Sequence, residues 1–362
     1  MMSKSVLILG GTGAMGKPLQ DVLLNKGFEV SVTSRSKHES GTVTFYQGNA
    51  HNIEFVKQLL IEHCFDTVID FMSYSTEEFK RIVDIFLDNT RQYIFISSAR
   101  VYAETQGLIT EDSPRLLDVC EDEEYLKTDE YALRKAREEN IIFESGKHNW
   151  TIVRPSITYN DERLQMPVAE KEDWLFRVLE GRSIVFPSDL KTIKTTLSYG
   201  DDVAKAIGEL VSNENAMGQV VHIAGAPAVT WEQVLNIYCQ ALEPIIGAVN
   251  VVYVDHVEKI SYPLGKNYQV KYARAINREF DNTKLFSIIG KMEFASAENG
   301  LTDCIRKFST GPRRFKTISW KNEALSDRIC HERTPLKSFQ KTKWKALYLM
   351  ARYSPYFSLM KK

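Results

Sequence analysis

Tyr131 and Lys135 are the residues whose types and spacing best suit proton chemistry. They stand four positions apart in a predicted helix, so both side chains lie on one face, one turn apart. A free tyrosine has a pKa of about 10, and a nearby ammonium stabilises the phenolate and moves that pKa toward neutrality. Such a tyrosine can exchange a proton with a carbinol or carbonyl oxygen while a nicotinamide exchanges hydride. Ser98, at a strand end, is placed to hold the same oxygen.

A glycine-rich turn near the start of the chain predicts a binding site for a dinucleotide. Residues 6–9 are apolar and indicate a buried strand, and a helix-forming run follows at 18–24. This order brings a pyrophosphate onto the N-terminus of a helix. Gly10 permits the tight turn, Gly13 lets the backbone approach the phosphates, and Gly16 allows close packing. We expect the cofactor to contact Gly10, Thr12, Gly13, Ala14, Met15 and Gly16.

The elements that must position these residues alternate between strand and helix. Further strands are predicted at 28–33, 42–46, 66–72, 93–97 and 150–155, with helices between them, including 76–87 and the segment that carries Tyr131. This alternation predicts an α/β fold, a doubly wound parallel Rossmann sheet with right-handed crossovers. Ligands of such sheets bind at the carboxyl ends of the strands. The residues expected there are Ser34, Arg35, Asn49, Phe71, Met72, Ser73, Ser97 and Ser98.

The end of the second strand favours NADP over NAD as the cofactor. Units that bind NAD place an acidic residue there to hold the ribose 2′-hydroxyl. This chain has Ser34 and Arg35 instead, and an arginine suits a 2′-phosphate. The alternative is that Arg35 is an ordinary solvated surface residue.

From about residue 161 the regular alternation ends, which predicts a smaller C-terminal lobe for the substrate. We expect a nucleotide-binding domain at 1–160, a substrate lobe with strands returning to the sheet at 161–310, and a basic tail at 311–362. Asp201 or Asp202 is expected to cap a helix that reaches about residue 211, and Thr230 to cap a helix over 231–242. Residues 103–128 are acidic and predict an irregular surface loop.

Composition places the 362 residues among globular proteins, with 43% hydrophobic and 26% charged residues. No run of 18 apolar residues occurs, and the chain leaves no room for a signal peptide before its first strand. The five cysteines form no CxxC pair and the seven histidines show no ligand spacing. We therefore expect reduced thiols, no metal site and a cytoplasmic location.

The C-terminal tail is strongly basic. From Gly311 onward there are 13 Lys/Arg and 3 Asp/Glu, against a net charge of −1 for the whole chain. A predicted helix would place Trp344, Leu347, Tyr348 and Ala351 on one face, ended by Pro355. Three roles stay open: packing on the protein's own body or a second subunit of a homodimer, peripheral contact with an anionic membrane, and contact with RNA, the least favoured.

Taken together, the motifs resemble the short-chain dehydrogenase/reductase superfamily, in its extended, sugar-nucleotide epimerase/dehydratase-like branch. The resemblance covers roughly residues 4–308, through the segments 10–16, 97–102, 131–135, 154–159 and 280–284. It implies that Ser98, Tyr131 and Lys135 are the catalytic set and that Asn49 lies near the adenine. It also adds Arg154 and Pro155 to the expected cofactor site. The implied activity is that of an NAD(P)-dependent oxidoreductase, an epimerase or reductase of a sugar or sugar nucleotide.

Departures from that resemblance narrow the expected chemistry. Sugar 4,6-dehydratases carry an Asp-Glu pair where this chain has Ala99-Arg100, so dehydration lacks its acid/base pair. Epimerases usually have an asparagine at the position of Ile157 and a diphosphate-binding arginine at the position of Thr195, although Lys194 could substitute. The lobe also resembles an atypical subgroup that includes chloroplast stem-loop RNA-binding proteins. The alternative hypothesis is a dinucleotide-binding protein that binds RNA or another partner and is not an enzyme.

Overall fold

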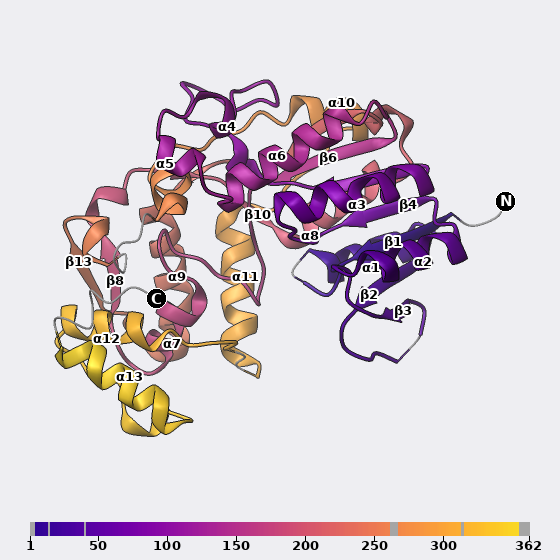
Figure 1. Cartoon of the computed structure of the whole chain (residues 1–362). Coiled ribbons are helices and arrows are strands. Elements are labelled where there is room, and N and C mark those ends of the chain that lie inside the picture. Colours follow the sequence, from indigo (N-terminus) through magenta and orange to yellow (C-terminus); the bar gives the residue numbers. More distant parts are fainter. Residues whose placement is uncertain (1–3, 14, 40, 261–266, 313–314, 355–362) are drawn as a thin grey trace. The chain divides into compact units, whose positions relative to one another are not determined.

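The computed structural model describes residues 4–13, 15–39, 41–260, 267–312 and 315–354. Ala14 and Pro355, which the sequence analysis singled out, lie outside the described residues. The chain forms two compact units (Figure 1). Unit 1 consists of Met1–Thr158, Thr196–Pro227 and Arg278–Ser296, and unit 2 of Tyr159–Thr195, Ala228–Asn277 and Ala297–Lys362.

Unit 1 is built on a seven-stranded parallel sheet, which confirms the predicted Rossmann-type α/β fold. The strand order is β3-β2-β1-β4-β5-β6-β11, and all neighbours pair in parallel. The strands are β1 (Ser5–Leu9), β2 (Glu29–Ser34), β3 (Thr44–Gln47), β4 (Thr67–Asp70), β5 (Gln92–Ile96), β6 (Trp150–Pro155) and β11 (Gln219–Ile223).

Helices cover both faces of this sheet because its central strands are apolar on both sides. In β1, Val6 and Ile8 pack with α1 (Gly16–Asn25), α8 (Gly200–Leu210) and α10 (Thr283–Ile289). The alternate residues, Leu7 and Leu9, lie in the core beneath α2, α3 and α6. Those helices span Ile53–His63, Thr76–Asn89 and Tyr131–Glu144. Burial on both faces explains the unbroken apolar run of the first strand.

Capping residues fix several helix ends, and one predicted cap is wrong. Gly27 has a φ of +82° and follows the last turn of α1, as expected for a glycine that ends a helix. Thr230 caps α9 (Trp231–Ile246) in a capping box with Gln233. Asp201 does not cap α8, which begins at Gly200, and neither does Asp202. The buried carboxylate of Asp202 instead accepts the N–H of Ala295 at 2.7 Å.

The connections of unit 1 hold a few short elements. The predicted irregular stretch 103–128 contains two single-turn helices, and other short pieces flank the strands. A two-stranded sheet pairs β7 with β10. These elements are η1 (Ala99–Val101), α4 (Leu116–Val119), α5 (Glu123–Leu126), β7 (Ile157–Tyr159), β10 (Leu197–Tyr199) and η3 (Glu214–Ala216).

Unit 2 is mainly helical and contains two small sheets. Helices α9 and α11 (Ala297–Thr310) pack together, β8 (Ile184–Pro187) pairs in parallel with β13 (Val251–Val254), and β9 (Lys194–Thr195) pairs with β12 (Val229–Thr230). The remaining elements are α7 (Lys171–Leu179), η2 (Ser188–Leu190), η4 (Val257–Lys259), η5 (Val270–Arg274), α12 (Trp320–Ile329), η6 (Leu336–Ser338) and α13 (Thr342–Tyr353).

The C-terminal segment is part of unit 2, and the predicted apolar face of its last helix packs on the protein's own chain. Tyr348 and Ala351 of α13 are buried in one cluster with Trp320 and Ala324 of α12. Trp344 and Leu347 pack against the same cluster. Of the three roles left open for this face, packing within the chain is the one confirmed.

A buried ion network also ties α12 to the rest of unit 2. The guanidinium of Arg177 on α7 lies 3.1 Å from Glu323 and 2.8 Å from Asp327. Arg182, just before β8, pairs with the same two carboxylates. All four side chains are at most 6% exposed. Arg177 also pairs with Glu332 at 2.8 Å. Breaking one buried pair by removing its carboxylate typically costs about 3–5 kcal/mol. No helix in the described ranges is both long and apolar enough to cross a membrane.

Candidate functional site

The glycine turn between β1 and α1 has the geometry of a phosphate cradle. Gly10 has a φ of +71°, which favours glycine. A Cβ on Gly16 would collide with the backbone of Gly11, so α1 can begin this close to the turn only with glycine at 16. A Cβ on Gly13 would meet nothing within 4 Å, which leaves open space in front of the turn. Thr12 is exposed and Met15 is half-buried beside this space.

The residues predicted for the adenosine end of the cofactor are all accessible. Ser34 is the last residue of β2, and its hydroxyl lies 3.0 Å from His38 Nε2. Arg35 follows it and is exposed, and its guanidinium has no ion-pair partner in the described chain. Asn49 follows β3 and is exposed, and its side-chain oxygen accepts the N–H of His51 at 3.2 Å.

Ser98 and Tyr131 each contact Arg100, through different parts of that residue. The N–H of Arg100 donates to Ser98 Oγ at 3.2 Å, and its guanidinium carbon lies 5.2 Å from the centre of the Tyr131 ring. Tyr131 is the first residue of α6 and is half-buried. Its hydroxyl has no hydrogen-bond partner among the described residues.

Lys135 lies one turn further along α6 and is buried, with 2% of its side chain exposed. Its ammonium is 3.0 Å from Glu138 Oε2, donates to the backbone oxygen of Met72 at 3.4 Å, and lies 4.3 Å from the centre of the Phe95 ring. Met72 and Ser73 follow β4, and Phe95 is on β5. The lysine is thus fixed beneath the carboxyl ends of two central strands.

Two buried carboxyl groups, Asp70 and Glu138, share the positive charge of Lys135. Burial raises the pKa of Glu138 from 4.5 to about 7, against the opposing effect of Lys135. Burial likewise raises the pKa of Asp70 from 3.8 to about 6, although Asp70 accepts the N–H of Met72 at 2.8 Å and the hydroxyl of Tyr93 at 2.8 Å. The charge on this cluster therefore changes near neutral pH.

Ser97 and Arg154, which were expected near the cofactor, have their side chains engaged inside the protein. Arg154 donates to both oxygens of the fully buried Glu139, at 2.8 and 2.7 Å. Ser97 Oγ donates to the same carboxylate at 2.6 Å. Pro155 is the buried last residue of β6. These contacts brace α6 against β5 and β6, so they position Tyr131.

Arg134, which sequence analysis did not single out, lies beside the candidate catalytic residues. Its guanidinium carbon is 5.7 Å from the centre of the Tyr131 ring, and its Nη2 donates to Ser73 Oγ at 3.0 Å. Arg134 is half-buried. Its position three residues after Tyr131 on one helix is the signal that could have revealed it.

The sequence analysis also missed three acidic residues of the site, namely Asp70, Glu138 and Glu139. Glu138 stands three positions after Lys135, a spacing at which side chains meet on a helix. Asp70 ends an otherwise apolar strand core. No local pattern predicts the contact of Glu139 with Arg154, because the two residues lie on different elements.

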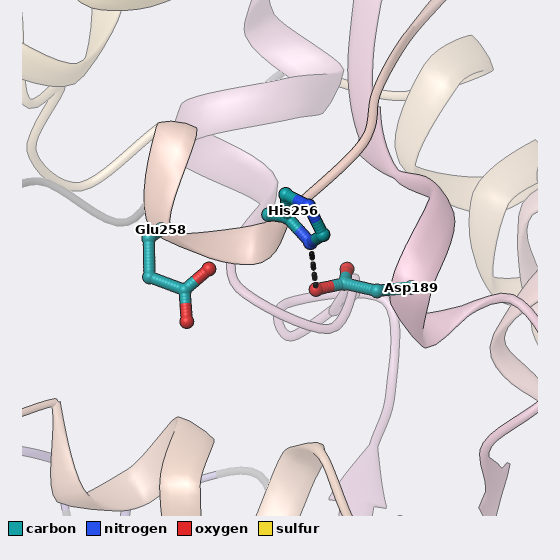
Figure 2. A group of neighbouring side chains, drawn as sticks. All are labelled: Asp189, His256 and Glu258. Atoms are coloured by element: carbon teal, nitrogen blue, oxygen red, sulfur yellow. Dashed lines mark ion pairs between the residues drawn. The ribbon is translucent and has the colours of Figure 1, made fainter.

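One group of possible metal ligands lies in unit 2, where Asp189, His256 and Glu258 place one ligand atom each within 4.8 Å of the others (Figure 2). All three are exposed. Asp189 Oδ2 lies 3.7 Å from His256 Nδ1 and accepts the N–H of Val257 at 3.0 Å. The carboxylate therefore has a structural role at η4, and we assign no metal to this group.

Comparison with known proteins gives the fold and the family. The chain is 28% identical to the chloroplast stem-loop binding protein of 41 kDa b of Arabidopsis thaliana over 281 residues, 72% of this chain and 70% of that protein. The structure is similar to that of the Bordetella bronchiseptica enzyme WbmH in complex with NAD+, with a TM-score of 0.65 and 16% identity over 85% of this chain and 99% of the other.

It is also similar to UDP-glucuronic acid 4-epimerase from Bacillus cereus in complex with UDP-glucuronic acid and NAD, with a TM-score of 0.63 and 17% identity over 84% of this chain and 99% of the other. At these identities the two structures establish the fold alone. Residues 6–224, more than half of the chain, match the family described as NAD dependent epimerase/dehydratase. The chain therefore belongs to the NAD dependent epimerase/dehydratase family.

Proposed function

We propose that the protein is an NAD(P)-dependent epimerase or reductase that acts on a sugar or sugar nucleotide by hydride transfer. The main support for this proposal is the arrangement of three side chains near the carboxyl ends of β4 and β5. The hydroxyl of Tyr131 has no hydrogen-bond partner among the described residues, Ser98 and Tyr131 both contact Arg100, and Lys135 is buried one turn further along α6. The open space in front of Gly13 fits the dinucleotide that this chemistry requires.

In the proposed reaction, Tyr131 is the acid and base. A bound nicotinamide supplies the hydride acceptor and donor for the sugar carbon. The phenol oxygen takes the proton of the sugar hydroxyl as the carbonyl forms and returns it when the carbonyl is reduced. Ser98 Oγ accepts the Arg100 N–H, and its own proton is free to donate to the same sugar oxygen. Lys135 is held beneath the same strand ends by Glu138 and by the backbone oxygen of Met72.

We also propose a preference for NADP over NAD. Its support is the end of β2, where Ser34 is followed by the exposed Arg35 and no carboxylate stands in either position. An arginine there can pair with a 2′-phosphate. The similar structures described above contain NAD and give this preference no support, so it rests on Ser34 and Arg35 alone.

The alternative proposal is a dinucleotide-binding protein that binds RNA or another partner and is not an enzyme. The supporting observation is the 28% identity to a relative named as a stem-loop binding protein. Mass spectrometry of the nucleotide that co-purifies with the protein, followed by NMR of UDP-sugars incubated with it, separates the two proposals. Conversion of a sugar by the loaded protein supports the enzyme. A protein that converts none but binds a stem-loop RNA in a salt-dependent manner favours the alternative.

A peripheral membrane contact would have to use the outer face of α13, because its inner face is packed on α12. That outer face exposes Leu349, Met350 and Tyr353, which are 36%, 46% and 59% exposed, and the exposed Lys341 and Lys343 stand near its start. A basic helix with apolar side chains suits an anionic lipid surface. We propose a weak, salt-sensitive contact there.

A further inference from the structure

Two guanidinium groups flank the ring of Tyr131, and they differ in how their charges are balanced. Arg100 lies 5.2 Å from the ring centre and pairs with Glu130 at 2.6 Å. Arg134 lies 5.7 Å from the ring centre and has no carboxylate within ion-pair distance in the described chain. Its Nη2 donates only to the neutral hydroxyl of Ser73.

The other cation near Tyr131 cannot supply a free positive charge to a ligand. Lys135 is buried and already shared between Glu138 and Asp70. Among the described residues, Arg134 is therefore the cation of this group that has no carboxylate within ion-pair distance. A half-buried guanidinium has lost part of its hydration and has gained no counter-ion in return. Binding of an anionic ligand beside it is therefore favourable, because the ligand supplies that counter-ion.

We infer that Arg134 binds a carboxylate that the substrate carries close to the carbon that reacts. This inference rests on the proposed function. The substrate oxygen must lie within hydrogen-bond reach of the Tyr131 hydroxyl, and Arg134 lies beside that ring. A planar guanidinium matches a carboxylate with two parallel hydrogen bonds. The substrate class is thus an acidic sugar, in which a carboxylate replaces a hydroxymethyl group.

A cofactor phosphate is the other source of an anion, and the site's layout favours the substrate. The glycine turn after β1 provides the phosphate cradle through open space at Gly13 and the start of α1. Arg134 belongs to a different element, α6, and is held at the end of β4 through Ser73. An anion of the substrate is the partner that its place beside Tyr131 requires.

The test compares two ligands that differ only in this group, UDP-glucuronic acid and UDP-glucose, by calorimetry on the cofactor-loaded protein. We expect the wild type to bind the acid roughly 10- to 100-fold more tightly, as a charge-assisted hydrogen bond predicts. Arg134→Met should remove that difference, and Arg134→Lys should restore part of it. Arg81→Met, which removes the same charge from the exposed surface of α3, should behave as wild type.

Each other outcome overturns the inference in a recognisable way. If the wild type binds both sugars equally, Arg134 does not bind the substrate's carboxylate, although the proposed function stands. If Arg134→Met loses affinity for NAD or NADP and keeps the preference between the sugars, the arginine belongs to the cofactor site. If neither sugar binds to the loaded wild type, the proposed function fails together with the inference. Thermal unfolding of each variant shows that it is folded.

Discussion

Replacing Glu138 by glutamine should change how the stability of the protein depends on pH. Glu138 is fully buried beside Lys135, and burial raises its pKa from 4.5 to about 7. Between pH 4.5 and about pH 7, Glu138 is protonated in the folded protein and ionised in the unfolded chain. The free energy of unfolding therefore falls as the pH rises through this window. At about 1.36 kcal/mol per pH unit, the window corresponds to roughly 3 kcal/mol.

The glutamine variant resembles the protonated glutamic acid and does not ionise. We expect Glu138→Gln and the wild type to have similar stabilities near pH 5, and the variant to be more stable by up to roughly 3 kcal/mol near pH 8. Burial also raises the pKa of Asp70 from 3.8 to about 6, so the free energy of unfolding falls with rising pH between these values too. The variant keeps this second pH dependence. Comparing the variant with the wild type cancels the titrations of groups that do not interact with Glu138.

Urea unfolding at pH 5 and pH 8 measures the effect, with the midpoint and slope fitted at each pH. Glu144→Gln is the matched control, because Glu144 is exposed at the end of the same helix. It should follow the wild type at both pH values. The reasoning is refuted if the stability of Glu138→Gln equals that of the wild type at both pH values. It is also refuted if the variant is less stable than the wild type at pH 8 and at least as stable at pH 5.

Two further predictions concern the cofactor and the C-terminal helix. Ser34→Asp combined with Arg35→Asn should reverse the preference for NADP, because the acid binds the 2′-hydroxyl and repels a 2′-phosphate. Titration of both cofactors measures this, and a wild type that binds NAD more tightly contradicts it. The wild type should co-sediment weakly with anionic liposomes at low salt and be released as salt rises. Met350→Ser combined with Tyr353→Ser should abolish that binding, whereas a wild type that stays in the supernatant at low salt refutes the contact.

Cutting the chain at Thr310 is not a suitable control for the liposome experiment. Glu323 and Asp327 of α12 neutralise the buried Arg177 and Arg182. Without them unit 2 would contain two buried cations with no counter-charge from α12, which destabilises a fold strongly. Substitutions on the exposed face of α13 leave this network intact.

The sheet could be predicted because the pattern of apolar residues within each short segment indicates a buried strand. Residues 6–9 are apolar without alternation, and such a run suits a central parallel strand with helices on both faces. Once the strands were placed, the location of the candidate site could be predicted, because the carboxyl ends of parallel strands share one edge of the sheet. Ser98, Tyr131 and Lys135 are found at that edge. The apolar face of α13 was predicted by the same kind of local periodicity.

The balance of charges around the site could not be predicted, because it depends on contacts between distant elements. Glu139 meets Arg154 only when α6 lies on β6. The pair of Lys135 and Glu138 has a visible helical spacing, yet nothing local shows that both side chains are buried. Asp202 was expected to be a cap by its type, but a contact with the distant Ala295 determines its position.

The central claim is that Tyr131 is the acid and base of a hydride-transfer reaction on a sugar. The most direct measurement follows by NMR the conversion of a sugar nucleotide by cofactor-loaded wild type and by Tyr131→Phe, with Tyr253→Phe on the exposed surface of unit 2 as the control. We predict that Tyr131→Phe folds, binds the cofactor and loses activity by roughly 10²- to 10⁴-fold, while the control retains it. An active wild type whose activity survives Tyr131→Phe would contradict the account.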